Sequence, residues 1–227
     1  MDRKKEKSIN QKLVFAIIHF IALLISFWIL FYPEQNFILK IFGEAKIATP
    51  LISRIIIFSS ASLYFVRHII TLFVLLKREI PWNEVFGVGA FIAIIQVLFA
   101  TLTIYNKSTF NSFDWLFVAL VAFGSYLNTG SELQRMVWKK RKSNKGKLYT
   151  EGLFKYSMHI NYFGDTILFT GFALLTGCAL ALLVPVFITL GFVFYHIPEL
   201  DTYLKERYKK QFAEYESKTK KFIPWIY

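Results

Sequence analysis

Asn128, Glu132 and Arg135 are the first residues along this chain whose types and spacing could bind a ligand. They are four and three residues apart, so a helix would carry them on one face. Together they offer amide, carboxylate and guanidinium groups for hydrogen bonds and charge pairing. The simpler interpretation is the polar end of a helix that meets water, with Glu132 in a surface ion pair.

A second polar cluster follows within residues 152–165. His159, Tyr162 and Asp165 recur every three residues, and Asn161 precedes Asp165 by four, so a helix would bring these side chains toward one bundle interior. Polar groups at the start of a membrane span need partners, and such convergence suits a ligand. Alternatively, His159 bonds a backbone carbonyl and Tyr162 belongs to an aromatic belt. The density of the cluster favours a site.

The elements that must position these residues are apolar helices. The chain is 55% hydrophobic and 19% aromatic, with a mean hydropathy of +0.44, which is too apolar for a soluble domain. We expect an all-α, polytopic membrane helical bundle of about six transmembrane helices. The apolar runs cover residues 13–32, 50–76, 85–105, 115–138, 162–176 and 179–197. A break near Arg54 would make them seven.

The chain is predicted to form one membrane domain, residues 1–227. Residues 1–110 would supply N-terminal helices on the substrate side, and residues 111–227 a cofactor-binding half with a cytoplasmic tail. The first apolar run follows basic residues, as in a signal peptide, but it is about 20 residues long and lacks a small-residue cleavage pattern, which predicts a retained span. The lone Cys178 is interpreted as a core residue, and no metal site is expected.

The basic residues are distributed unevenly. Of the 27 lysines and arginines, 22 lie at the N-terminus, at residues 77–78, or in residues 135–155 and 205–221. With six spans these segments share one side, whereas the other side holds only Lys40, Lys46 and Lys107. The positive-inside rule therefore places both termini of this multi-pass protein in the cytoplasm, and in the inner membrane if the cell is bacterial. Nucleic acid is not expected as a partner, because base-stacking motifs are missing; membrane lipids or a phosphorylated cofactor fit better.

The segment G-L-F-K-Y-S-M-H-I-N-Y-F-G-D, residues 152–165, resembles the signature shared by steroid 5α-reductases, sterol reductases and isoprenylcysteine carboxyl methyltransferases. Asn128, Glu132 and Lys139 are similar to residues that precede that signature in the 5α-reductases. The C-terminal F-A-E-Y and I-P-W, residues 212–215 and 223–225, are also similar. The resemblance covers residues 128–227 and points to the 5α-reductase-like membrane proteins, including the DUF1295 family.

This resemblance implies an NADPH pocket that faces the cytoplasm. Asn128, Glu132 and Asn161 would contact the nicotinamide end, and Lys139, Lys147 and Tyr208 the phosphates and adenosine. His159, Tyr162 and Asp165 would complete the cofactor-binding set. The chain departs from the pattern where relatives carry Arg and Pro, since it has Met158 and Ile160. It also has Glu199-Leu200-Asp201 in place of the adjacent glutamates of the methyltransferases, and Leu200 and Leu204 where the reductases carry Arg and His.

The activity implied is reduction of a carbon–carbon double bond in a lipophilic substrate, such as a steroid, an isoprenoid or an enoyl lipid. A donor must then bind the substrate carbonyl as negative charge develops there. Tyr64 with His68, four residues apart in the second span, are the predicted catalytic pair, with Arg67 a further candidate. All three could instead serve packing or pairing. Two alternatives to the reductase are an S-adenosylmethionine-dependent methyltransferase and a non-catalytic lipid-binding protein.

Overall fold

The computed structural model describes residues 8–35, 37, 39 and 49–227, and the regular elements of this part are all helical. The predicted all-α membrane fold is confirmed. Lys40 and Lys46, and the basic residues before Ser8, lie outside the described residues. The chain divides into two compact units, residues 1–119 with 171–182 and residues 120–170 with 183–227. The single membrane domain with parts 1–110 and 111–227 stays a prediction.

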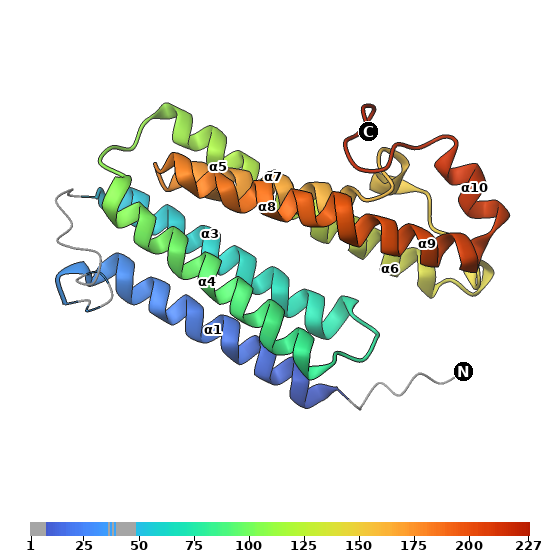
Figure 1. Ribbon diagram of the computed structural model, residues 1–227, viewed down its shortest axis with the longest axis horizontal. Helices are drawn as coiled ribbons and strands as arrows, with labels where there is room; N and C mark the ends of the chain where they lie inside the picture. The colour runs from blue at the N-terminus through green and yellow to red at the C-terminus, as the bar shows by residue number, and fades with distance from the viewer. Residues whose placement is uncertain (1–7, 36, 38, 40–48) are drawn as a thin grey trace. The chain divides into compact units, whose positions relative to one another are not determined.

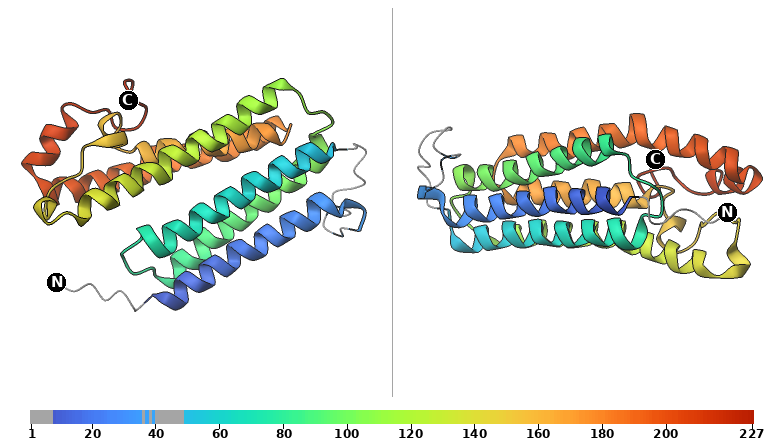
Figure 2. Two further views of the ribbon diagram at one scale, coloured as in Figure 1. Left: turned by 180° about the vertical axis from the view of Figure 1, so that it is seen from behind. Right: turned by 90° about the horizontal axis from the view of Figure 1, so that it is seen from below.

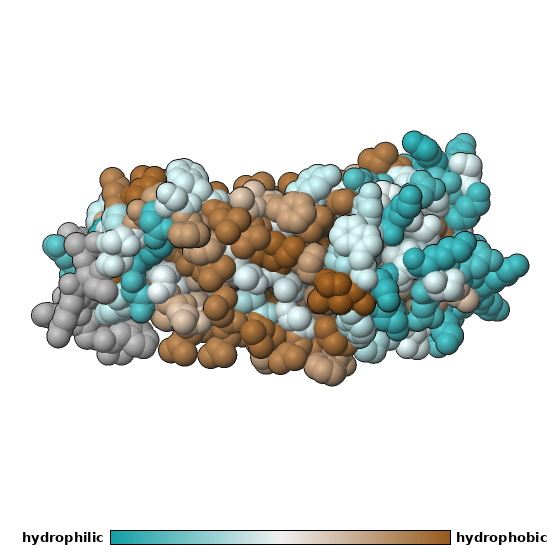
Figure 3. All heavy atoms as spheres, turned by 90° about the horizontal axis from the view of Figure 1, so that it is seen from above, coloured by the Kyte–Doolittle hydropathy of each residue, from teal (hydrophilic) through white to brown (hydrophobic). Residues whose placement is uncertain are grey.

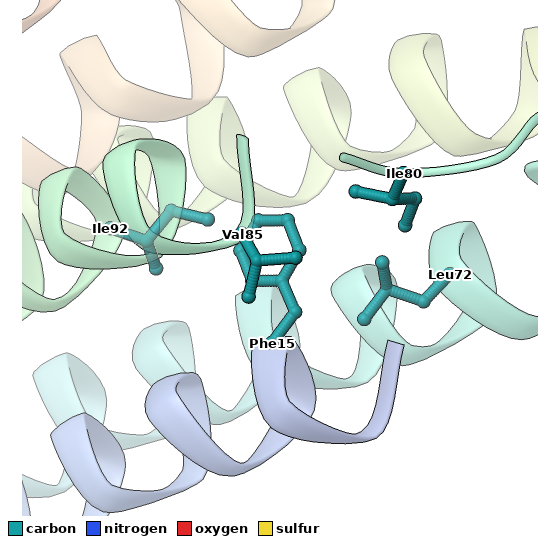
Figure 4. Packing of buried hydrophobic residues seen from close by; sticks show 5 residues of the cluster. All are labelled: Phe15, Leu72, Ile80, Val85 and Ile92. Carbon is teal, nitrogen blue, oxygen red and sulfur yellow. The ribbon is translucent and has the colours of Figure 1, made fainter. Parts of the chain in front are cut away.

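The first unit is built on three long helices that lie side by side: α1 (Ile9–Phe31), α3 (Leu51–Ile70) and α4 (Trp82–Asn106) (Figures 1 and 2). The π-helical turn η2 (Thr71–Leu75) extends α3, and the 3-10 turn η1 (Pro33–Gln35) follows α1. Figure 4 shows part of the shared core, in which Phe15 of α1 packs among Leu72, Ile80, Val85 and Ile92. Successive helices run in opposite directions, so α3 is antiparallel to α1 and α4, whereas α1 and α4 run in the same direction (Figure 1).

Proline sets the boundaries of these helices. Pro50 and Pro81 occupy the cap positions immediately before α3 and α4, and Pro33 begins the turn after α1. A proline lacks an N–H donor and is tolerated at a helix start but not in its interior. α3 runs unbroken through Arg54, whose Nε donates to the Thr49 carbonyl at 3.0 Å. The alternative of a seventh span formed by a break there is wrong for this helix.

A buried ion pair closes the connection after α4. Lys107 Nζ lies 2.5 Å from Asp114 Oδ1, and the two side chains are 9% and 1% exposed. Asp114 lies in the first turn of α5 (Ser112–Ser125) and also accepts a hydrogen bond from the Asn111 N–H at 2.7 Å. Gly177 has φ +73°, and a Cβ there would lie 3.1 Å from Lys107 Cδ. The glycine therefore allows the chain to pass beside the lysine stem.

The second unit starts inside α5. The elements that follow α5 along the chain are η3 (Tyr126–Gly130), α6 (Ser131–Lys140), the 3-10 turns η4 (Lys142–Asn144) and η5 (Gly152–Lys155), α7 (Ile160–Leu175), η6 (Ala179–Leu182), α8 (Leu183–Gly191), η7 (Phe192–His196), α9 (Ile197–Tyr208) and α10 (Lys210–Glu216). All of them belong to the second unit except η6 and the end of α7, which belong to the first. η3 and η7 are π-helical.

The backbones of α5 and α7 meet at two glycines. A Cβ on Gly124 would lie 2.5 Å from the Gly164 carbonyl oxygen, and one on Gly164 would lie 2.6 Å from the Asn128 nitrogen. Only glycine allows this approach, as is common between membrane helices.

Four of the described helical stretches are long and apolar enough to cross a membrane: residues 9–31, 51–75, 82–106 and 179–208. These stretches overlap the predicted spans at residues 13–32, 50–76, 85–105 and 179–197. The chain is therefore an integral membrane protein. α7 is apolar but shorter, with 16 residues, and α5 has 14. In Figure 3 hydrophilic residues cover the end of the second unit that carries α9 and α10, while hydrophobic ones gather over α8. The polar clusters of the sequence, at residues 128–135 and 152–165, lie in this second unit.

Candidate functional site

Four side chains of the second unit, Asn128, Glu132, Asn161 and Asp165, form an amide–carboxylate group. Asn128 Nδ2 donates to Asp165 Oδ2 at 2.9 Å and to the Asn161 carbonyl at 3.1 Å. Asn161 Nδ2 donates to Glu132 Oε1 at 3.1 Å. The convergence expected from the spacing of these residues is therefore present. The side-chain oxygens of Asn128 and Asn161 accept no hydrogen bond from the residues that the structure describes, so two acceptors remain for a ligand.

Two local features hold this group together. Asn128 lies in the π-helical turn η3, and π-turns occur often at functional sites. The close approach at Gly124 and Gly164 brings η3 against the start of α7, where Asn161 and Asp165 lie one helical turn apart. Arg135 forms an ion pair with the second oxygen of Glu132. Sequence spacing identified the polar residues but not the glycines that bring their helices together.

His159 begins a second chain of contacts in the same unit. Its Nε2 lies 2.9 Å from Asp201 Oδ1, and its side chain is 1% exposed. Lys221 Nζ lies 3.3 Å from Asp201 Oδ2 and 3.2 Å from Glu216 Oε1. The partner of His159 is thus a carboxylate and not the backbone carbonyl considered as an alternative. Sequence reasoning missed Asp201 and Lys221, although it had noted the acidic residues at 199 and 201.

The C-terminal segment fixes the position of His159. The N–H groups of Met158 and His159 donate to the carbonyls of Lys220 and Lys221 at 2.8 and 2.9 Å. Burial lowers the pKa of the Lys221 ammonium, but hydrogen bonds and charge from Glu216 and Asp201 raise it more, so the net pKa lies above its ordinary value of 10.5. Lys221 is therefore a cation at neutral pH and supports the Asp201 carboxylate.

Tyr162 lies between two parallel rings. The centroid of its ring lies 5.7 Å from that of His159, with an angle of 5° between the ring planes. On the other side it lies 4.5 Å from the centroid of Phe192, in the π-helical η7, with an angle of 7°. Its hydroxyl has no hydrogen-bond partner among the described residues. Glu132 and Asp165 are close enough to act electrostatically on Tyr162. The phenol therefore belongs to the same polar region, and its hydroxyl is available to a ligand.

Lys139 and Arg207 lie on the ring of Tyr208, and we call these three residues the cation–tyrosine group. Lys139 Nζ lies 5.1 Å and Arg207 Cζ 5.7 Å from the ring centroid, and Lys139 also donates to the Tyr208 hydroxyl at 3.1 Å. Lys139 donates to the Lys147 carbonyl at 2.5 Å, whereas the Lys147 side chain is exposed. Neither Lys139 nor Arg207 pairs with a carboxylate of the described chain. Two cations of this group thus lack an anionic partner there.

The predicted catalytic pair lies in the first unit, beside a histidine that the sequence analysis missed. His68 Nδ1 lies 2.8 Å from His19 Nδ1, so one ring donates to the other. The Tyr64 ring lies 5.0 Å from His19, and Arg67 lies over Tyr64 at 5.9 Å. Gln96 of α4 is 2% exposed and its amide atoms have no hydrogen-bond partner among the described residues. Polar groups inside membrane helices are costly to bury and need partners, so these residues stay candidates for a functional role.

The described part of the chain brings together no set of three or more histidine, cysteine, aspartate or glutamate side chains that could hold a metal ion. Its polar groups instead offer amides, carboxylates, a phenol and cations. Such a set can hydrogen-bond an organic cofactor and neutralise phosphate charge.

Fold and site together define a class: an all-α integral membrane protein with a dense polar group at the junction of short helices. The chain belongs to the family described as "Protein of unknown function (DUF1295)", whose model matches residues 49–219. The predicted family is confirmed. A protein named "Probable O-methyltransferase ustE", from Ustilaginoidea virens, is 36% identical over 89 residues. That match covers 39% of this chain and 31% of the length of the relative.

Proposed function

We propose that this protein is a membrane-embedded, NADPH-dependent reductase that acts on a carbon–carbon double bond of a lipophilic substrate. The observation that carries the proposal is the pair of polar groups in the second unit. Counting the described residues alone, the amide–carboxylate group offers amide oxygens that accept no hydrogen bond, and the cation–tyrosine group offers two cations without carboxylate partners. A nicotinamide dinucleotide needs both, because it has a carboxamide at one end and phosphates further along.

The geometry of α6 supports this assignment. Glu132 and Lys139 are seven residues apart on α6, so they lie on one face about 10 Å apart along the helix axis. The carboxamide of a nicotinamide would donate to the free oxygens of Asn128 and Asn161, while Lys139 and Arg207 would pair with phosphate oxygens. An extended dinucleotide spans such a distance. The residues present therefore fit the cofactor.

When bound, NADPH supplies a hydride to the β-carbon of a conjugated double bond, and a proton completes the saturated product. The roles of the chain's own residues are to orient and to donate. Tyr64 and His68 stay the predicted donors to the substrate carbonyl, and His19 adds a partner that holds the His68 ring. With His19 Nδ1 as the donor in this contact, the proton of neutral His68 would lie on Nε2, as a donor to the substrate requires.

The uneven distribution of lysine and arginine supports an orientation in which both termini and the cofactor region face the cytoplasm. The large exposed apolar side chains on the membrane-length helices, such as Ile17, Phe20 and Leu24 of α1, support a lipophilic substrate that enters from the acyl chains. NADPH would then arrive from the water and the substrate from the membrane.

A second candidate is an S-adenosylmethionine-dependent methyltransferase, and the relative named as a probable O-methyltransferase favours it. The two candidates differ in charge. S-Adenosylmethionine carries a sulfonium cation and no phosphate, so it would use Glu132 and Asp165 but would not need Lys139 or Arg207. Substitution of Lys139 and Arg207 by neutral residues should therefore weaken binding of NADPH but not of S-adenosylmethionine, which distinguishes the two functions.

The test is isothermal titration calorimetry of the purified, detergent-solubilised protein with NADPH and with S-adenosylmethionine. The reductase predicts saturable NADPH binding that weakens about tenfold or more in Lys139→Gln and Arg207→Gln, since each charged hydrogen bond contributes roughly 1.5–3 kcal/mol. The control Lys142→Gln removes an exposed charge in the basic loop and should keep the affinity. Binding of S-adenosylmethionine alone would support the second candidate. Binding of neither would overturn both.

A further inference from the structure

A cavity of about 260 Å³ lies at the end of the first unit where α1 begins and η2 ends. Its lining is part basic and part apolar: Lys12, Lys77 and Arg78, with Ser8, Ile9, Phe73, Val74 and Leu76. The cavity is smaller than the roughly 300–1,000 Å³ of most small-molecule sites. Its volume suits a charged headgroup rather than a whole cofactor.

The π-helical turn shapes the cavity. The Leu76 N–H donates to the Thr71 carbonyl, five residues earlier, at 2.8 Å, and the backbone of Leu76 is then extended, with φ −80° and ψ 112°. The Leu76 carbonyl leaves the helix and accepts a hydrogen bond from Lys12 Nζ at 2.9 Å. Lys12 is thereby held at the cavity wall with the other two ammonium protons unused.

The charges that the described residues place around the cavity do not cancel. Arg78 is neutralised by two hydrogen bonds to Glu84, at 2.7 and 2.6 Å. Lys12 and Lys77, in contrast, have no carboxylate partner among the residues that the structure describes. In the described part of the chain, two cations without a carboxylate partner therefore face a small cavity, which is the arrangement expected for an anion.

The apolar lining identifies the kind of anion. Ile9, Phe73 and Val74 are 48%, 41% and 48% exposed, and they belong to helical stretches long enough to cross a membrane. Side chains exposed on such helices face acyl chains. A water-soluble anion such as a nucleotide would leave this apolar rim unused, whereas a phospholipid matches both halves of the lining.

We propose that this cavity binds the headgroup phosphate of an anionic phospholipid, with the acyl chains against Ile9, Phe73 and Val74. Basic pockets at the ends of membrane helices recognise anionic headgroups by the same combination of charge and apolar contact. The proposal concerns the first unit alone and does not depend on the reductase activity or its cofactor.

The test measures retention of phosphatidylglycerol and phosphatidylcholine by the full-length protein, using native mass spectrometry of detergent-solubilised samples. We expect phosphatidylglycerol to be retained in preference to phosphatidylcholine. The double variant Lys12→Gln/Lys77→Gln should lose about thirtyfold in affinity, because each basic residue near an anionic surface contributes roughly 1 kcal/mol. The control Lys142→Gln/Lys145→Gln removes the same charge from an exposed loop and should change the affinity less than twofold.

Equal retention of the two lipids, or equal losses in the two double variants, would overturn the proposal. Competition by millimolar inorganic phosphate alone would also overturn it, because the site would then recognise free phosphate. If Lys12→Gln/Lys77→Gln does not fold, a photoactivatable phosphatidylglycerol added to the wild-type protein provides the second measurement. Its crosslinks should map to residues 8–13 and 73–78, and crosslinks elsewhere would contradict the site.

Discussion

Gly124→Ala should separate α5 from α7 and thereby disturb the amide–carboxylate group. The added Cβ would lie 2.4 Å from the Leu168 nitrogen, 2.5 Å from the Gly164 oxygen and 2.8 Å from the Leu168 Cα. All three are backbone atoms of α7, so no side-chain rotation relieves the contact. Ordinary van der Waals contact begins near 3.4 Å, so the helices must move apart by about 1 Å.

The expected effect has two parts. Overpacking of this kind costs about 1–3 kcal/mol, and the higher helix propensity of alanine offsets about 1 kcal/mol of that loss. A shift of about 1 Å also stretches the bonds from Asn128 to Asp165 and to Asn161, now 2.9 and 3.1 Å, beyond hydrogen-bond length. We therefore expect a net loss of up to about 2 kcal/mol and weaker NADPH binding.

Thermal unfolding in detergent measures the first effect and calorimetry with NADPH the second. The matched control is Gly191→Ala in α8, because a Cβ there meets nothing within 4 Å. This control should unfold at the same or a higher temperature, since alanine favours a helix. If Gly124→Ala unfolds at the same temperature as the control or higher, and binds NADPH with unchanged affinity, the glycine contact does not position the site.

Three further predictions concern other contacts. Asp114→Ala should lower stability by about 3–5 kcal/mol in thermal unfolding, because Lys107 is left buried without its partner; a loss below 1 kcal/mol would contradict burial of the pair. His19→Leu should destabilise by about 1–3 kcal/mol because His68 loses its partner, whereas His19→Leu/His68→Leu should recover part of that loss; additive losses would argue against the contact. The raised pKa of Lys221 means that its stabilisation is complete below pH 10.5 and is lost as pH rises through the higher folded-state pKa. Unfolding temperatures between pH 9 and 12 should therefore fall more steeply in the wild type than in Lys221→Gln, and parallel curves would refute the linkage.

The membrane helices were predictable because their signal is local. Apolar runs predicted spans over residues 50–76 and 85–105, and the structure has helical stretches at 51–75 and 82–106. Spacing along one helix also predicted the shared face of Asn128 and Glu132, and the alignment of Asn161 with Asp165, because neighbours at four residues are fixed by helix geometry. Each of these inferences needed only one element.

Contacts between elements were not predictable from one sequence. His19 and His68 are 49 residues apart, and Asp201 lies 42 residues after His159. Lys107 was counted as a loop charge, although it is 8% exposed and paired with Asp114. Which residues meet across helices depends on packing register, which a helical periodicity does not contain. The glycine at 124, four residues before Asn128, is a local signal in the sequence that permits close helix packing, but it does not identify the helix that packs there.

The π-helical turns η2, η3 and η7 should respond to insertions and deletions differently from the α-helical segments beside them. A ring closed from residue i to i+5 holds one residue more than the α-helical ring, so each turn acts as an inserted position within a continuous helix. The wider turn absorbs this extra residue, so the α-helical segments on either side keep nearly the faces that they would have without it. A one-residue insertion or deletion within the α-helical winding would instead rotate all that follows by about 100°. An insertion directly after Ser131 in α6 should therefore turn Glu132 away from Asn161, whereas deletion of one residue within residues 126–130 should change the face of Glu132 much less.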